Sequence, residues 1–214
     1  MKTYTTETTA TMDGLTVYLN TLKGSGCSME MLGAAKRQVD AMLTHHNKVL
    51  TIYLGVHVST YTPDNAVMSQ YVRSVRKMLT TKPSSRAASC RPAFRRVGFA
   101  WFREMDRARK QHYHMAIMLD GNVVRAPQRI FDSVLKPAAE RLGATAWLYE
   151  RACRLDRQDK DAYLACLYRL SYGAKEHSKY GRKATANDYS TSRIQPSPST
   201  SWTGFKNEAS KSCT

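Results

Sequence analysis

Two histidines separated by a single residue, His112 and His114, lie at the start of an apolar run that ends at Asp120-Gly121. On a β-strand, residues two apart point to the same face, roughly 6.6 Å from each other, so both imidazoles can reach one metal ion. The intervening Tyr113 would then face the core. The same pattern also fits two solvent-facing histidines near the start of a strand, so the pair alone does not decide.

Glu104 is the third candidate ligand, because it lies eight residues before His112, on the strand predicted to pair with it. If the hairpin register places Glu104 on the histidine face, two imidazoles and a carboxylate can hold a divalent ion and leave positions free for a substrate. A one-residue slip or a bulge would reverse that placement. Glu104 would then be a surface partner for Arg103 or Arg107. This ligand set also suits zinc or non-haem iron, whereas chemistry on a phosphate favours Mn²⁺ or Mg²⁺.

Tyr168, Tyr172 and Lys175 recur at spacings of four and three, which places them on one face of a helix. A tyrosine oxygen is a weak nucleophile at its usual pKa of about 10. Beside a metal-bound phosphate it can attack phosphorus and form a 5′-phosphotyrosine ester, which conserves the bond energy for later rejoining. Lys175 can add positive charge near the phosphate or the phenolate. The alternative is an amphipathic helix with aromatic residues in the core.

A sheet and a helix must position these residues, and the periodicity of the chain predicts both. We expect helices over 28–47, 64–80, 126–143 and 156–180, with an interruption near Pro137, and strands over 49–61, 97–106, 112–121 and 144–155. The second and third strands form an antiparallel hairpin. This order predicts an α+β fold with a central antiparallel or mixed sheet, helices on its apolar face, and the other face open for a ligand.

The two ends of the chain are polar. We expect residues 1–14, which are rich in threonine, to form a disordered or loosely attached arm, and residues 184–214, which are rich in Ser, Thr and Pro, to form a disordered tail. The chain therefore divides into an arm and helix (1–47), one central domain (48–183) and a tail (184–214).

Lysine and arginine outnumber aspartate and glutamate by 33 to 17, and the net charge of +16 indicates a polyanionic partner. Nucleic acid is the commonest such partner. A membrane surface is the alternative, although no stretch approaches the ~20 apolar residues of a spanning helix. The polar N-terminus does not resemble a signal peptide. Five scattered cysteines with no CxxC pair fit free thiols in a reducing cytoplasm.

Basic residues concentrate between residues 73 and 110, where twelve lysines and arginines accompany two acids. Such a segment can neutralise phosphates, with a salt-sensitive affinity that is largely independent of base sequence, or it can be a solvated loop. The candidate phosphate contacts are Arg73, Arg76, Lys77, Arg95, Arg96, Arg107, Arg109 and Lys110.

The hairpin "GFAWFREMDRARKQHYHMAIMLDG" and the helix "CLYRLSYGAK" together resemble the HUH endonuclease superfamily. Within it, the chain most resembles the two-tyrosine initiators of rolling-circle replication, of the inovirus type found in phages, prophages and satellites. The resemblance covers roughly residues 48–183, which would form the endonuclease domain with a ferredoxin-like or RRM-like core. It implies a divalent metal on Glu104, His112 and His114.

The resemblance also implies nicking and religation of single-stranded DNA at an origin, with Tyr172 as the first nucleophile and Tyr168 as its partner. His57, in a strand that matches the first motif of the family only loosely, can approach the site or be an ordinary strand histidine. We expect single-stranded DNA or an origin hairpin as the substrate, and a host helicase and polymerase as partners in a bacterial cytoplasm. The alternatives are a relaxase or single-strand transposase of the same superfamily, or a DNA-binding regulator without cleavage. The oligomeric state stays open.

Overall fold

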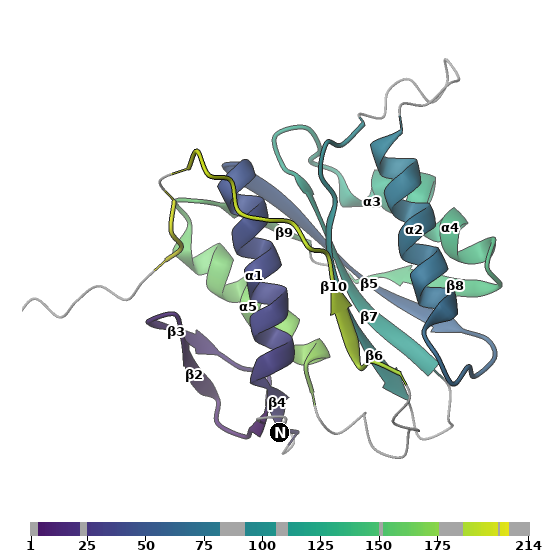
Figure 1. The fold of residues 1–214 in the computed structure, drawn as a ribbon, viewed down its shortest axis with the longest axis horizontal. Coiled ribbons are helices and arrows are strands. Elements are labelled where there is room, and N and C mark those ends of the chain that lie inside the picture. Colours follow the sequence, from purple (N-terminus) through teal and green to yellow (C-terminus); the bar gives the residue numbers. More distant parts are fainter. Residues whose placement is uncertain are drawn as a thin grey trace, which may run out of the picture.

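The computed structural model describes residues 4–21, 25–81, 93–105, 111–149, 152–175, 186–200 and 202–205. Within these residues, a six-stranded antiparallel sheet lies between two layers of helices (Figure 1). The predicted α+β class and the antiparallel sheet are therefore confirmed. Among the described residues, no helix is both long and apolar enough to span a membrane.

The sheet is centred on β5 (Lys48–Val58) and the hairpin of β6 (Gly98–Met105) and β7 (Gln111–Asp120). Its order is β10-β6-β7-β5-β8, and every described pairing is antiparallel. The segment predicted as one strand over 144–155 forms two strands, β8 (Ala144–Leu148) and β9 (Cys153–Asp156). Both pair with β5, at successive positions along the same edge of that strand.

One face of the sheet carries the large aliphatic and aromatic residues that alternate along β5, β6 and β7, including Ile52, Tyr113 and Ile117. Four helical segments cover this face: α2 (Ala66–Thr80), α3 (Pro127–Ile130), the π-helical η3 (Phe131–Leu135) and α4 (Lys136–Glu140). The predicted interruption of this last helix near Pro137 corresponds to η3, which directly precedes α4. Proline has no backbone N–H, so regular helical hydrogen bonding cannot continue through it.

The face that carries the histidines is also covered, by α1 (Met29–His45) and α5 (Lys160–Gly173) (Figure 1). Both helices begin at a side-chain cap, because Ser28 Oγ accepts from the Met31 N–H and the Asp159 carboxylate from the Ala162 N–H. The expectation of helices on only one face was wrong. Beyond the histidines, this face continues into apolar residues such as Ala116 and Met118, and their burial favours a second helical layer.

Residues 4–14 are ordered, which corrects the predicted disordered or loosely attached arm for the described part of 1–14. β1 (Tyr4–Thr5) pairs with β4 (Cys27–Ser28), while β2 (Thr9–Met12) and β3 (Leu15–Tyr18) form a hairpin. The two turn residues, Asp13 and Gly14, have φ values of 50° and 77°. This is the conformation that a two-residue Asp-Gly hairpin turn requires. Leu15 and Val17 are fully buried and belong to the core formed with α1 and α5.

The predicted disordered tail is likewise wrong for residues 186–200. β10 (Tyr189–Thr191) pairs with β6, and the segment after it crosses α1 (Figure 1). Ser192 Oγ donates to Gln38 of α1 and accepts from the Phe99 N–H of β6. Such pairing satisfies backbone groups at a sheet edge, which a polar composition does not reveal. The last part of the predicted tail, 206–214, lies outside the described residues.

Candidate active site

The register of the β6–β7 hairpin brings three predicted ligands together. Glu104 lies directly opposite His112, and Phe102 lies opposite His114, so Glu104 and both histidines share one face. Glu104 Oε2 is 3.2 Å from His112 Nε2 and 3.1 Å from His114 Nε2. The possible slip or bulge did not occur. Glu104 is only 5% exposed, and Arg103 points to the opposite face, where it donates to the Thr62 carbonyl.

These three side chains can hold a metal ion, because one ligand atom from each lies within 4.8 Å of the other two. A cation with metal–ligand distances of about 2.1 Å keeps adjacent ligands about 3 Å apart, close to the separations of Glu104 from both imidazoles. Two neutral nitrogen donors and one carboxylate form a set that binds divalent transition metals. The donor atoms and their spacing therefore fit a single divalent ion.

Tyr149, which the sequence reasoning missed, orients one of these ligands. Its hydroxyl lies 2.9 Å from His114 Nδ1, and the two rings stack at 5.8 Å with an interplanar angle of 17°. Burial raises the pKa of Tyr149 to about 12, so its hydroxyl remains protonated at neutral pH. When His114 offers Nε2 to a metal, its Nδ1 carries the proton and donates to the Tyr149 oxygen. Partners of this kind fix both the tautomer and the ring orientation of a metal ligand.

Tyr172 is the candidate nucleophile that lies beside this group. It is 41% exposed at the end of α5, and its ring stands edge-on to His114, with the centroids 5.1 Å apart. Lys175 Nζ lies 3.1 Å from the centroid of the Tyr172 ring. The structure therefore brings together one predicted tyrosine, the predicted lysine and the candidate metal ligands.

Gly173 allows the last turn of α5 to approach the sheet this closely. A Cβ atom at Gly173 would lie 2.4 Å from Cδ2 of Phe102, the residue opposite His114. The N-terminal segment holds the same turn from the other side. The Asn20 N–H donates to Ser171 Oγ, and the Ser28 N–H donates to the Ala174 carbonyl, both at 2.8 Å.

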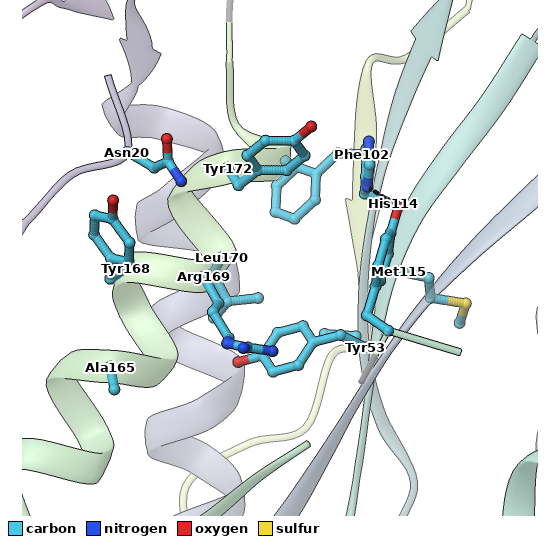
Figure 2. A pocket seen from close by; sticks show the side chains of 13 residues that line it. Asn20, Tyr53, Phe102, His114, Met115, Ala165, Tyr168, Arg169, Leu170 and Tyr172 are labelled. Carbon is cyan, nitrogen blue, oxygen red and sulfur yellow. Dashed lines mark hydrogen bonds between the residues drawn. The ribbon is translucent and has the colours of Figure 1, made fainter. Parts of the chain in front are cut away.

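A pocket of about 770 Å³ lies between α5 and the sheet. It adjoins the candidate metal group, by which we mean Glu104, His112 and His114. Figure 2 shows Tyr172 beside His114, whereas Tyr168 lies across the pocket, near Asn20. Tyr168 thus lines the same pocket as Tyr172 but lies one helical turn earlier in α5. Arg169, also missed from the sequence, lines the same pocket and stacks over Tyr53 at 5.5 Å. The pocket therefore combines both tyrosines, the candidate metal ligand His114 and the cation of Arg169.

A family model for the YagK/YfjJ C-terminal domain matches residues 8–188. The chain belongs to this family. The matched range includes every residue of the metal group and of the pocket. Comparisons with curated proteins and with solved structures gave no match.

His57 of this YagK/YfjJ-family chain lies near the metal group but does not belong to it. It is opposite His112 on β5, and its Nε2 atom is buried without a hydrogen-bond partner in the described part of the chain. The group whose ligand atoms lie within 4.8 Å contains Glu104, His112 and His114, without His57.

Among the residues that the structure describes, most of the predicted phosphate contacts lie away from the candidate metal group. Arg73, Arg76 and Lys77 are exposed on α2, over the opposite face of the sheet, where they line a groove of about 370 Å³. Arg95 is also exposed. Burial lowers the pKa of His46, and the positive charge of nearby Arg96 lowers it further. His46 pairs with Asp120 at the end of β7, so Arg96 lies near the end of the sheet away from His112. Arg107, Arg109 and Lys110 lie outside the described residues.

Proposed function

We propose that this chain cleaves and rejoins single-stranded DNA through Tyr172, with a divalent ion, Mn²⁺ or Mg²⁺, on Glu104, His112 and His114. The observation that carries the proposal is the contact between an exposed tyrosine and a metal ligand: the Tyr172 ring lies 5.1 Å from that of His114. The net charge of +16 supports a polyanionic substrate.

In the proposed reaction, Tyr172 Oη attacks the phosphorus of one phosphodiester. The bond from phosphorus to the 3′ oxygen breaks, the proton lost by tyrosine reaches that oxygen, and the 5′ end becomes a phosphotyrosine ester. A bound divalent ion supplies positive charge to the phosphate oxygens. Lys175, over the Tyr172 ring, adds a second positive charge that favours the phenolate. Attack by a free 3′ hydroxyl reverses these steps and rejoins a strand.

The biological role we propose is initiation of rolling-circle replication at an origin. Two tyrosines in one pocket support this role, because they can accept successive DNA ends: Tyr172 accepts the first and Tyr168 the second. Host helicase and polymerase would then open and copy the DNA. A relaxase or a single-strand transposase would use the same residues and differ in its DNA substrate.

Incubation with single-stranded oligonucleotides from both strands of the genetic element that encodes the protein, with Mn²⁺, tests the proposal. We expect a protein–DNA adduct that survives denaturing electrophoresis, that is lost in Tyr172→Phe, and that persists in Tyr18→Phe. Tyr18 is a matched control because it is 61% exposed in the N-terminal hairpin.

A second candidate is a DNA-binding regulator, which the exposed cations of α2 favour because they lie over the other face of the sheet. Salt-sensitive DNA binding by the wild type with no adduct on any strand of its own element would support the regulator and exclude the nickase.

A further inference from the structure

Trp147 is a large aromatic side chain that the fold leaves open to solvent beside the metal group. It is 37% exposed, whereas Trp101 on β6 is 4% exposed. Along β8 the burial alternates, with Ala144 and Ala146 buried and Trp147 exposed. Trp147 pairs with Gly55 of β5, and Gly55 pairs in turn with His114 of β7. Trp147 therefore lies two strands from His114, or about 10 Å across the sheet.

Gly55 beneath the Trp147 indole and Tyr149 beside it hold the ring in place. A Cβ atom at Gly55 would lie 2.0 Å from Trp147 Cζ2, so the ring occupies the space that any other residue at position 55 would fill. Tyr149 meets the indole edge-on at 6.2 Å and bonds to His114 through its hydroxyl. Trp147 is thus joined through one side chain to a candidate metal ligand.

We propose that Trp147 is a stacking platform for an unpaired base of the DNA strand whose phosphate would bind the divalent ion on Glu104, His112 and His114. This inference rests on the proposed function and adds a positioning residue to it. Every base has an aromatic face, so stacking on an exposed ring recognises a single strand without reading its sequence. A ring fixed in place before binding loses little conformational entropy when a base stacks on it. The net charge of +16 attracts the backbone of the same strand.

Titration of the full-length protein with a single-stranded oligonucleotide, followed by tryptophan fluorescence, tests the platform. We expect the oligonucleotide to quench the wild type and Trp202→Phe, while Trp147→Leu loses most of the quenching. Trp202 is the matched control because its ring meets Phe205, which in turn contacts Tyr163 of α5. The expected affinity of Trp147→Leu is about 5- to 150-fold weaker, the range for loss of one stacked base.

Gly55→Ala is the second variant, since it keeps the indole but displaces it from its place on β5. We expect Trp147→Leu and Gly55→Ala to need more DNA for half-maximal adduct formation and to reach the wild-type adduct yield at saturation. An abasic oligonucleotide of equal length separates stacking from charge, because wild type and Trp147→Leu should bind it equally.

The two proposals fail separately. If Trp147→Leu binds DNA with wild-type affinity and the adduct still depends on Tyr172, the proposed stacking on Trp147 is wrong and the proposed cleavage through Tyr172 is supported. Quenching that depends on Trp147 in a protein that forms no adduct would support the platform and overturn the nickase. A loss of affinity in Trp147→Leu that is equally large with the abasic strand would also overturn the platform.

Discussion

The ring of Tyr172 stands edge-on to the imidazole of His114, with the ring centroids 5.1 Å apart. Tyr172 lies on α5 and His114 on β7. The close fit between Gly173 and Phe102, which lies opposite His114 on β6, brings α5 against this part of the sheet. An exposed hydroxyl-bearing side chain is thereby fixed beside a ligand of the candidate metal group. Metal binding and nucleophilic attack can therefore be tested with different substitutions.

Removal of one ligand should abolish specific metal binding. We expect Mn²⁺ to raise the Tm of the wild type and to leave His114→Ala and the near-isosteric Glu104→Gln unchanged, because stabilisation by a ligand requires selective binding to the folded state. Thermal unfolding with increasing Mn²⁺ measures this. His45→Ala, a histidine at the end of α1, is the control. An unchanged Mn²⁺ response in both ligand variants would contradict the proposed site.

Tyr149→Phe should weaken the binding of the metal without removing a ligand. Loss of the hydroxyl at 2.9 Å frees the His114 ring to rotate. Loss of an outer partner of this kind typically costs 10- to 100-fold in metal affinity, roughly the increase in Kd that we expect. Isothermal titration calorimetry with Mn²⁺ measures this Kd. Tyr61→Phe is the control, because Tyr61 is exposed and contacts Arg103. Equal Kd values in Tyr149→Phe and wild type would show that the hydroxyl does not orient His114.

Gly173→Ala should separate α5 from the sheet, since the new Cβ would meet the Phe102 ring at 2.4 Å. We expect a loss of stability of about 1–3 kcal/mol from overpacking and a larger loss of adduct formation, with Mn²⁺ affinity retained. Gly33→Ala in α1 is the matched control, because its Cβ would meet only ordinary contacts at 3.5 Å and beyond. That change should stabilise the helix by up to about 1 kcal/mol. Wild-type adduct formation in Gly173→Ala would contradict this positioning role.

The N-terminal hairpin should lose an interaction at low pH. A hydrogen bond from Lys36, which is also close enough for charge attraction, lowers the pKa of Asp13 below its usual value. A lowered folded-state pKa means that this stabilisation is present above about pH 4, the unfolded value, and disappears as pH falls through the folded value. Asp13→Asn should therefore lower Tm at pH 7 and have a smaller effect below pH 4. Asn tolerates the positive φ of this turn. A Tm difference that does not change with pH would exclude this ion pair as its cause.

The predicted parts of the site are those for which local periodicity suffices. Alternation along residues 112–120 assigns Tyr113 and Met115 to one face and the two histidines to the other, and the structure agrees. The face of the sheet on which Glu104 lies depends on the register of the hairpin, and both strands together define that register. The sequence of one strand therefore does not determine whether Glu104 faces the histidines, and the pairing of Glu104 with His112 does.

The errors also have physical reasons. The alternation in residues 9–18 and the Asp13-Gly14 turn between them are a strong hairpin signal, although the threonine-rich composition by itself is typical of a disordered segment. The ordering of residues 189–191 comes from hydrogen bonds to β6, which local composition does not contain. Charge density likewise does not indicate on which face Arg73 and Arg76 lie. Helical periodicity placed them on α2, but only the packing of α2 shows that they lie opposite the metal group.

Mass spectrometry of the protein after reaction with single-stranded DNA and Mn²⁺ tests the central claim most directly. After nuclease and protease digestion, we expect a residual nucleotide phosphate on Tyr172 in the wild type. We expect none in Glu104→Gln or His114→Ala, which retain the tyrosine. A nucleotide on another residue while Tyr172 remains unmodified, or equal modification of Tyr172 without the metal ligands, would contradict the account.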